Sequence, residues 1–111
     1  MTSKRILVVE DDPKSLYAMK AVLEHYGHQV TAFNSPTQAR ELDIAVIDTA
    51  LIDLRLPDMS GGELARQLKR KKSNLQVILM TAYSREVVDG DLAGFPLLVK
   101  PLDMGQVLKM V

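Results

Sequence analysis

One feature limits most strongly how this chain can fold. Five times along the sequence, a short run of apolar residues is followed by a segment whose apolar residues have the spacing of an α-helix. The apolar runs predict strands at residues 5–9, 29–33, 49–53, 75–80 and 96–99. The segments that follow them predict helices at residues 13–26, 36–46, 61–72, 84–92 and 103–111. Strands that alternate with helices in this order are typical of repeated βα units. We therefore expect an α/β fold with five parallel strands and helices on both faces of the sheet.

Capping signals mark where several of these helices begin and end. Asp12-Pro13 is typical of an N-cap with proline at the first helical position, and Gly27 is placed to end the same helix. The stretches 35–38 and 60–63 both match the capping-box pattern, and Gly61-Gly62 serves the turn before the third helix. Helical spacing predicts that the following side chains face the core: Leu16, Met19, Leu23, Tyr26, Ala39, Leu42, Val46, Leu64 and Leu68.

Length, charge and composition exclude several classes of protein. A chain of 111 residues can form one core, so we expect residues 1–111 to be a single domain, alone or as the first domain of a longer protein. The 14 basic and 14 acidic residues balance, which disfavours direct binding to nucleic acid or to an anionic membrane. Cysteine is absent, which excludes disulfides and thiolate metal sites. No signal peptide or membrane-spanning run is apparent, and we expect a cytoplasmic domain.

Polar residues follow four of the predicted strands, and strand direction decides which of them can meet. In an open parallel α/β sheet the carboxyl ends of the strands share one edge, where ligands bind at the switch point of the strand order. The residues in these positions are Glu10, Asp11, Asp12, Asp53, Thr81 and Lys100. The dipeptide Ile-Asp occurs twice, but Asp48 precedes the third strand whereas Asp53 ends it. We therefore expect Asp53 to join the cluster and Asp48 to lie at the opposite edge.

A cluster of carboxylates with a lysine and a hydroxyl group indicates phosphoryl transfer to an aspartate. Carboxylates crowded at one edge repel one another unless a cation lies between them, and an all-oxygen set suits Mg²⁺ or Mn²⁺. Lys100 and Thr81 supply a positive charge and a hydrogen-bond donor for the oxygens of an incoming phosphoryl group. Asp53 is then the nucleophile, and its product is an acyl phosphate.

Four segments of the chain resemble the receiver domains of two-component response regulators. They are residues 6–13 (ILVVEDDP), 51–61 (LIDLRLPDMSG), 77–82 (VILMTA) and 98–101 (LVKP). The resemblance covers essentially the whole chain, and four such motifs in the right order are highly specific. It implies a flavodoxin-like doubly wound five-stranded parallel sheet of order 2-1-3-4-5, with helices on both faces.

The resemblance also implies an acceptor and a set of metal ligands. Asp53, four residues before a proline, looks like the phosphoacceptor, and it also contributes to the metal site. Asp11 matches a direct ligand of Mg²⁺, and Glu10 matches a ligand that acts through water. The backbone carbonyl of Arg55 is implied as a further ligand.

Three more residues match the part of the family site that faces the phosphoryl group. Thr81 resembles the hydroxyl that turns toward this group, and the amide of Ala82 is expected to reach it as well. Lys100 resembles the lysine that pairs with the phosphoryl oxygens, and the following bond to Pro101 is typically cis in the family. The implied partner is a histidine kinase or a phosphotransfer domain. No enzymatic activity is expected beyond self-phosphorylation from acyl phosphates and self-dephosphorylation.

The chain departs from the family pattern near its predicted output face. Leu97 stands where the family commonly has a Tyr or Phe that moves on activation, and Phe95 is a candidate to replace that ring. The interval from residue 81 to residue 100 is shorter than usual, so we expect a short or irregular fourth helix. Tyr83 is expected to shield the acyl phosphate partly from water. The output partner stays open, as does the oligomeric state, for which a homodimer is one option.

Three other functions compete with that of a phosphoacceptor receiver. A docking module that is never phosphorylated normally lacks the acceptor, an acid or the lysine, all of which this chain has. An aspartate-nucleophile phosphatase has an Asp-x-Asp pair after its first strand, which residues 53–55 do not match. A nucleotide-binding Rossmann domain needs a glycine-rich loop where residues 10–12 are all acidic. The basic run 69–72 is typical of a solvated helix end and is a weaker candidate for partner binding.

Overall fold

The computed structural model describes residues 3–82 and 94–111 of the chain. These residues form one sheet of five parallel strands in the order β2-β1-β3-β4-β5. The strands are β1 (Arg5–Val9), β2 (Gln29–Phe33), β3 (Thr49–Asp53), β4 (Gln76–Thr81) and β5 (Leu97–Val99). The predicted fold class and strand order are confirmed, and no strand boundary differs from its predicted position by more than one residue.

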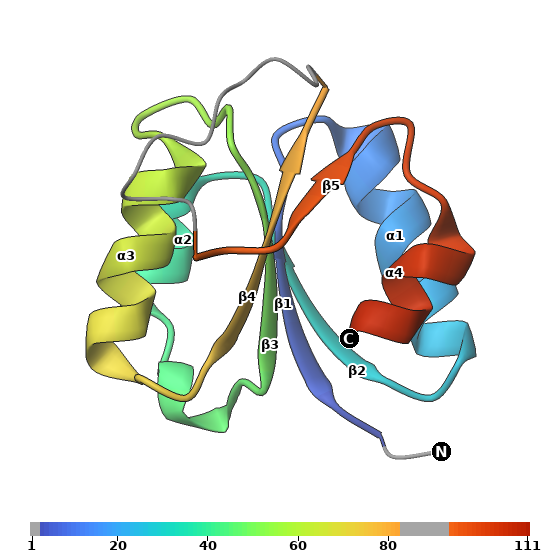
Figure 1. Cartoon of the computed structure of the whole chain (residues 1–111), viewed down its shortest axis with the longest axis horizontal. Coiled ribbons are helices and arrows are strands. Elements are labelled where there is room, and N and C mark those ends of the chain that lie inside the picture. The colour runs from blue at the N-terminus through green and yellow to red at the C-terminus, as the bar shows by residue number, and fades with distance from the viewer. Residues whose placement is uncertain (1–2, 83–93) are drawn as a thin grey trace.

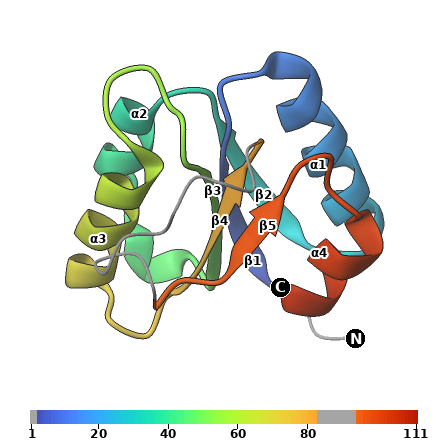
Figure 2. The ribbon, with the colours of Figure 1, turned by 45° about the horizontal axis from the view of Figure 1, so that its top comes forward.

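Helices cover both faces of this sheet, as predicted. They are α1 (Pro13–His25), α2 (Pro36–Glu41), α3 (Gly61–Lys71) and α4 (Met104–Met110), with a short 3₁₀ helix, η1 (Ile44–Val46), after α2. In Figure 1, α2 and α3 lie on one face of the sheet and α1 and α4 on the other, and Figure 2 shows the same layers from a second direction. Among the residues described, no helix is long and apolar enough to cross a membrane. The helix predicted over residues 84–92 lies outside the described residues.

Each face of the sheet has its own hydrophobic cluster. Successive residues of a strand point to opposite faces. Leu7 and Val9 of β1 therefore pack in the cluster beneath α2 and α3. Ile6 and Val8 pack in the cluster beneath α1 and α4. Because the central strands are buried on both faces, the residues at their carboxyl ends are held on a rigid support.

Local sequence signals set several helix ends as predicted. Asp12 is the N-cap of α1, and its side chain accepts a hydrogen bond from the N–H of Lys14. Ser60 is the N-cap of α3, and its hydroxyl accepts a hydrogen bond from the N–H of Glu63. Gly27 follows α1 with a φ of 93°, in the left-handed region that favours glycine.

Other local predictions in and after α1 and α2 are wrong. The second helix ends at Glu41, and Val46, expected in the core, is 43% exposed. The chain forms η1 instead and buries Ile44 there. Tyr26 is 46% exposed because it is the C-cap of α1, beyond the last helical residue. Ser35 is the N-cap of α2, but its side chain makes no capping hydrogen bond.

Candidate functional site

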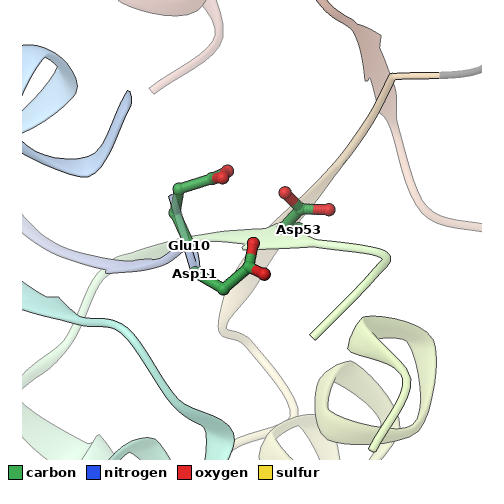
Figure 3. Close-up of side chains that lie close together, drawn as sticks. All are labelled: Glu10, Asp11 and Asp53. Atoms are coloured by element: carbon green, nitrogen blue, oxygen red, sulfur yellow. The ribbon is translucent and has the colours of Figure 1, made fainter. Parts of the chain in front are cut away.

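The carboxyl ends of the two central strands bring three carboxylates together. β1 and β3 pair with Val9 opposite Ile52, so the next residues, Glu10 and Asp53, are neighbours across the two strands. One oxygen from each of the carboxylates of Glu10, Asp11 and Asp53 lies within 4.8 Å of the other two. Figure 3 shows the three side chains directed toward a common region. The predicted acidic cluster is present at this edge of the sheet.

Lys100 reaches the cluster from the end of β5. Its Nζ donates one hydrogen bond to Oε2 of Glu10 and one to Oδ2 of Asp53, each at 2.6 Å. Glu10 is 1% exposed and Asp53 is 6% exposed, so water solvates neither carboxylate fully. Carboxylates in such surroundings need a cation or a proton. The ammonium group supplies that cation and links the ends of β1, β3 and β5.

Burial and charge shift two pKa values within this cluster. Burial raises the pKa of Glu10 to about 7, and the hydrogen bond with Asp53 adds to the increase, whereas Lys100 acts against it. Burial alone would lower the pKa of Lys100, but its hydrogen bonds to Asp53 and Glu10 outweigh that effect and raise the pKa. Lys100 is therefore held in its charged form, while Glu10 changes its protonation state near neutral pH.

The segment after β3 fixes the orientation of Asp53. The N–H of Arg55 donates a hydrogen bond to Oδ1 of Asp53 at 2.9 Å. The N–H of Gly61 donates to the carbonyl oxygen of Leu54 at 2.8 Å, which places the start of α3 against this segment. A Cβ on Gly61 would overlap the backbone oxygen of Asp53. Gly61, where the turn before α3 ends and the helix begins, is therefore needed for this close approach. The carbonyl of Arg55 as a metal ligand stays a prediction.

Thr81 and Ala82 lie where β4 ends. Thr81 is 1% exposed, and its carbonyl oxygen accepts a hydrogen bond from the N–H of Lys100 at 2.7 Å. This bond places the ends of β4 and β5 beside each other. The peptide bond between Lys100 and Pro101 is cis, as the resemblance implies. The roles of the Thr81 hydroxyl and the Ala82 amide stay predictions, and Tyr83 lies outside the described residues.

Two further acids near these strands do not join the cluster. Asp48 lies at the amino edge of the sheet, where its Oδ2 accepts a hydrogen bond from the N–H of Arg5 at 2.8 Å. Asp12 caps α1, and its Oδ2 accepts a hydrogen bond from the hydroxyl of Ser15 at 2.7 Å. That hydrogen bond lowers the pKa of Asp12. The structure thus places Asp53, and not Asp48, beside Glu10 and Asp11.

Sequence reasoning did not predict the ion pair between Glu10 and Lys100. It assigned Lys100 to the oxygens of a phosphoryl group and Glu10 to a metal. The structure shows both residues paired directly with each other. The signal was present in the sequence, because a lysine that follows a strand at an edge where acids gather will pair with those acids when no other ligand is bound.

Leu97 is the first residue of β5, and Phe95 lies just before that strand. Both side chains are partly buried and pack against the hydrophobic cluster beneath α2 and α3. Replacement of the family's mobile ring by Phe95 stays a prediction, and an unchanged set of activation-linked spectral shifts in Phe95→Ala would exclude it.

Comparison with known proteins identifies a family over nearly the whole chain. The family model for the response regulator receiver domain matches residues 6–111. Protein PilH of Pseudomonas aeruginosa is 34% identical over 113 residues, which cover 96% of this chain and 93% of PilH. The transcriptional regulatory protein ZraR of Klebsiella oxytoca is 35% identical over 102 residues, which cover 88% of this chain and 23% of ZraR. The chain therefore spans only about a quarter of that regulator.

A solved structure extends the comparison to three dimensions. The response regulator TrrA of Thermotoga maritima, in complex with Mg²⁺-BeF, superposes with a TM-score of 0.85 at 28% identity and covers 97% of this chain and 99% of TrrA. The family match over nearly the whole chain, the shared fold and the acidic cluster at the switch point agree with one another. This chain belongs to the response regulator receiver domains of two-component signalling.

Proposed function

We propose that this chain is a phosphoacceptor, which takes a phosphoryl group from a histidine kinase or a phosphotransfer domain onto Asp53 and then switches an output surface. The observation that carries the proposal is the ammonium group of Lys100, held 2.6 Å from Oδ2 of Asp53 at the end of β3. An aspartate with no role in a reaction would not need to be buried next to a positioned cation. In the proposed reaction the same cation faces the charge of the transferred group.

The proposed step is a nucleophilic substitution at phosphorus. A carboxylate oxygen of Asp53 attacks the phosphorus of a phosphohistidine, and the oxygen–phosphorus bond forms as the phosphorus–nitrogen bond breaks. The imidazole leaves with the electron pair of that bond and takes up a proton. The N–H of Arg55 orients the carboxylate through Oδ1. Lys100, the Thr81 hydroxyl and the Ala82 amide are the proposed donors to the phosphoryl oxygens.

The donor set at this edge fits a hard divalent cation. Glu10, Asp11 and Asp53 offer carboxylate oxygens that lie within 4.8 Å of one another, and such oxygens suit Mg²⁺ or Mn²⁺. These three residues, with the backbone carbonyl of Arg55, would hold the metal. When bound, the metal would neutralise the carboxylates and polarise the phosphoryl group. Glu10 must be ionised to contribute, so we expect metal binding to favour its charged form.

The similar proteins support this proposal in two ways. TrrA, whose structure is a complex with Mg²⁺-BeF, has the same fold at 28% identity. PilH is 34% identical to this chain, and the match covers 93% of PilH, which supports a role that lies within the receiver domain itself. The histidine kinase as partner follows from membership of the receiver family.

Intact mass spectrometry after incubation with acetyl phosphate tests the proposal. We expect one phosphoryl adduct on the wild type with Mg²⁺, and no adduct without the metal or on Asp53→Asn. Asp48→Asn is the matched control, because it removes the same charge from the other Ile-Asp dipeptide and keeps an oxygen for the N–H of Arg5. We expect this control to be modified as the wild type is.

Two outcomes would contradict the proposal. An adduct that persists in Asp53→Asn would show that another residue is the acceptor. If the folded wild type formed no adduct under any condition, and accepted none from a phosphorylated histidine kinase, the chain would be a docking module instead.

A further inference from the structure

The groove between α2 and α3 lies outside the proposed phosphorylation site. Its volume is about 580 Å³. It is lined by Thr37, Arg40 and Glu41 of α2 and by Gln67, Arg70 and Lys71 of α3. In both helices the lining residues have the spacing i, i+3, i+4, which places them on one face of a helix. Each helix therefore turns a polar stripe toward the other.

This groove has an excess of positive charge, and its two arginines form no ion pair within the described residues. Three of its lining side chains are cationic and one is acidic. Within residues 3–82 and 94–111, neither Arg40 nor Arg70 forms an ion pair, with Glu41 or with any other acid. The chain as a whole has a net charge of zero, so the excess is local. Arg40 and Arg70 are exposed, so water screens their mutual repulsion, and an anion between them would be attracted by both.

The three lysines of the basic run 69–72 have structural roles, and its arginine does not. Each of these lysines donates a hydrogen bond to a backbone carbonyl oxygen. Lys71 donates to the carbonyl oxygen of Arg40 at 2.9 Å and thereby fixes α3 against the end of α2. Lys72 bonds to carbonyl oxygens in and directly after η1. Arg70 is the one cation of the run without such a bond in the described structure, and it lines the groove with Arg40.

We propose that this groove binds an acidic segment of a partner protein, which presents carboxylates to Arg40 and Arg70. A guanidinium group binds a carboxylate through two parallel hydrogen bonds, and here two such groups line one groove. Glu41 disfavours a polyphosphate or a nucleic acid, because phosphates offer no donor to this carboxylate and are repelled by it. A peptide offers backbone N–H groups to Glu41 as well. The described lining also contains no aromatic ring on which a base could stack.

Binding in this groove leaves the acidic cluster accessible. Arg70 lies in the last turn of α3, and Lys72, just after it, contacts η1 before β3 begins. This end of α3 is at the amino edge of the sheet, at the bottom of Figure 1, whereas Asp53 is at the carboxyl edge. We therefore expect the acidic segment to bind whether or not Asp53 can accept a phosphoryl group.

The test is an NMR titration of ¹⁵N-labelled protein with a peptide made only of glutamate, at physiological salt. We expect saturable shifts centred on the amides of α2 and α3. The double variant Arg40→Gln/Arg70→Gln should bind about tenfold more weakly. The matched control Lys14→Gln/Lys109→Gln removes the same charge from α1 and α4, on the other face of the sheet, and should bind as the wild type does. Asp53→Asn should also bind as the wild type does.

Three outcomes would overturn the inference. Absence of saturable shifts would exclude the site, and equal weakening in both double variants would reduce it to general charge attraction. Tighter binding of tripolyphosphate or single-stranded DNA through Arg40 and Arg70 would assign the groove to phosphates instead of a protein segment. Circular dichroism melting of each variant establishes that it is folded. Arg40→Gln/Arg70→Gln keeps Asp53, so this variant should still form the phosphoryl adduct. Measurement of that adduct keeps the test of the groove separate from the test of the proposed function.

Discussion

The two Ile-Asp dipeptides of this chain lie at opposite ends of one strand, β3, and have different surroundings. At the amino edge Asp48 is exposed, and its side chain accepts a hydrogen bond from the N–H of Arg5. At the carboxyl edge Asp53 is 6% exposed and shares Lys100 with Glu10. The local sequence is the same, so the difference comes from strand direction. A parallel sheet gathers at one edge the residues that follow its strands, and at that edge Lys100 meets the carboxylates of Glu10 and Asp53 from distant segments.

Lysines at the two edges show the same contrast. Lys72, at the amino edge, donates to carbonyl oxygens of Ala45 and Ile47 and stabilises helix ends. Lys100, at the carboxyl edge, donates to two buried carboxylates. One cation has neutral partners and the other has ionisable ones. The stability of the two edges should therefore respond differently to loss of the lysine, to pH and to Mg²⁺.

The largest effect is expected when each lysine is replaced by methionine. Without metal at pH 8, Lys100→Met leaves two buried carboxylates without a cation and should lower the free energy of unfolding by about 3 kcal/mol. Lys72→Met removes hydrogen bonds to neutral groups and should cost about 1 kcal/mol. Urea unfolding measures both values. Mg²⁺ should restore most of the lost stability in Lys100→Met and none in Lys72→Met. Equal losses in the two variants, unchanged by Mg²⁺, would contradict this contrast.

A smaller effect is expected from glycine replacements at two helix starts. Gly61→Ala places a methyl group against the backbone oxygen of Asp53, so the segment after β3 must shift, and we expect a loss of about 2 kcal/mol. Gly105→Ala, in the first turn of α4, is the control, because its Cβ would lie 3.1 Å from a side-chain oxygen of Asp103, a contact that a small displacement relieves. Thermal unfolding of both variants checks the difference. A loss at Gly105 as large as that at Gly61 would show that close approach to Asp53 is not the cause.

The smallest expected effect is the contribution of Glu10 to the pH dependence of stability. Its pKa is raised from an ordinary value of 4.5 to about 7, so the folded state binds this proton more tightly than the unfolded state does. Its favourable contribution is complete below about pH 4.5 and is lost as the pH rises through 7. Glu10→Gln cannot ionise, so without metal it should be more stable than the wild type at pH 8, by about 1 to 2 kcal/mol.

Urea unfolding of Glu10→Gln and the wild type from pH 4.5 to 8, without metal, measures this difference. The gap should close toward the acid end of the range, where both side chains are neutral. A gap that is constant across the range, or a variant less stable than the wild type at pH 8, would show that burial does not govern the proton of Glu10.

The fold could be predicted where the cause is local or where both faces of a strand are buried. The buried strands Arg5–Val9 and Thr49–Asp53 are nearly continuous apolar runs, and Ser60 caps α3 through a contact three residues away. The predictions failed at Tyr26 and Val46, where helical spacing was extended beyond the end of a helix. Where a short helix stops depends on tertiary contacts that follow it, such as those of η1, which helical spacing alone does not reveal.

The candidate site could be predicted as a set of residues but not as a network. Strand direction alone was sufficient to bring Glu10, Asp11 and Asp53 to one edge. The bond between Glu10 and Lys100 joins residues 90 positions apart, and the contact of Gly61 with Asp53 depends on the distance between two backbone segments. Such distances are set by the packing of α3 and the strands. The position of a residue in the sequence predicts at which edge of the sheet it lies, but not which side chains at that edge contact one another.

Locating the phosphoryl group tests most directly the claim that strand direction makes Asp53, and not Asp48, the acceptor. Borohydride reduces an acyl phosphate and converts that aspartate to homoserine. Cleavage after Arg40 and Arg55 releases a single peptide, residues 41–55, that contains both aspartates, so fragmentation of this peptide compares them in one spectrum. We predict homoserine at residue 53 alone, and only when Mg²⁺ was present during phosphorylation. Homoserine at residue 48, or at neither position in a protein that carries the adduct, would contradict the claim.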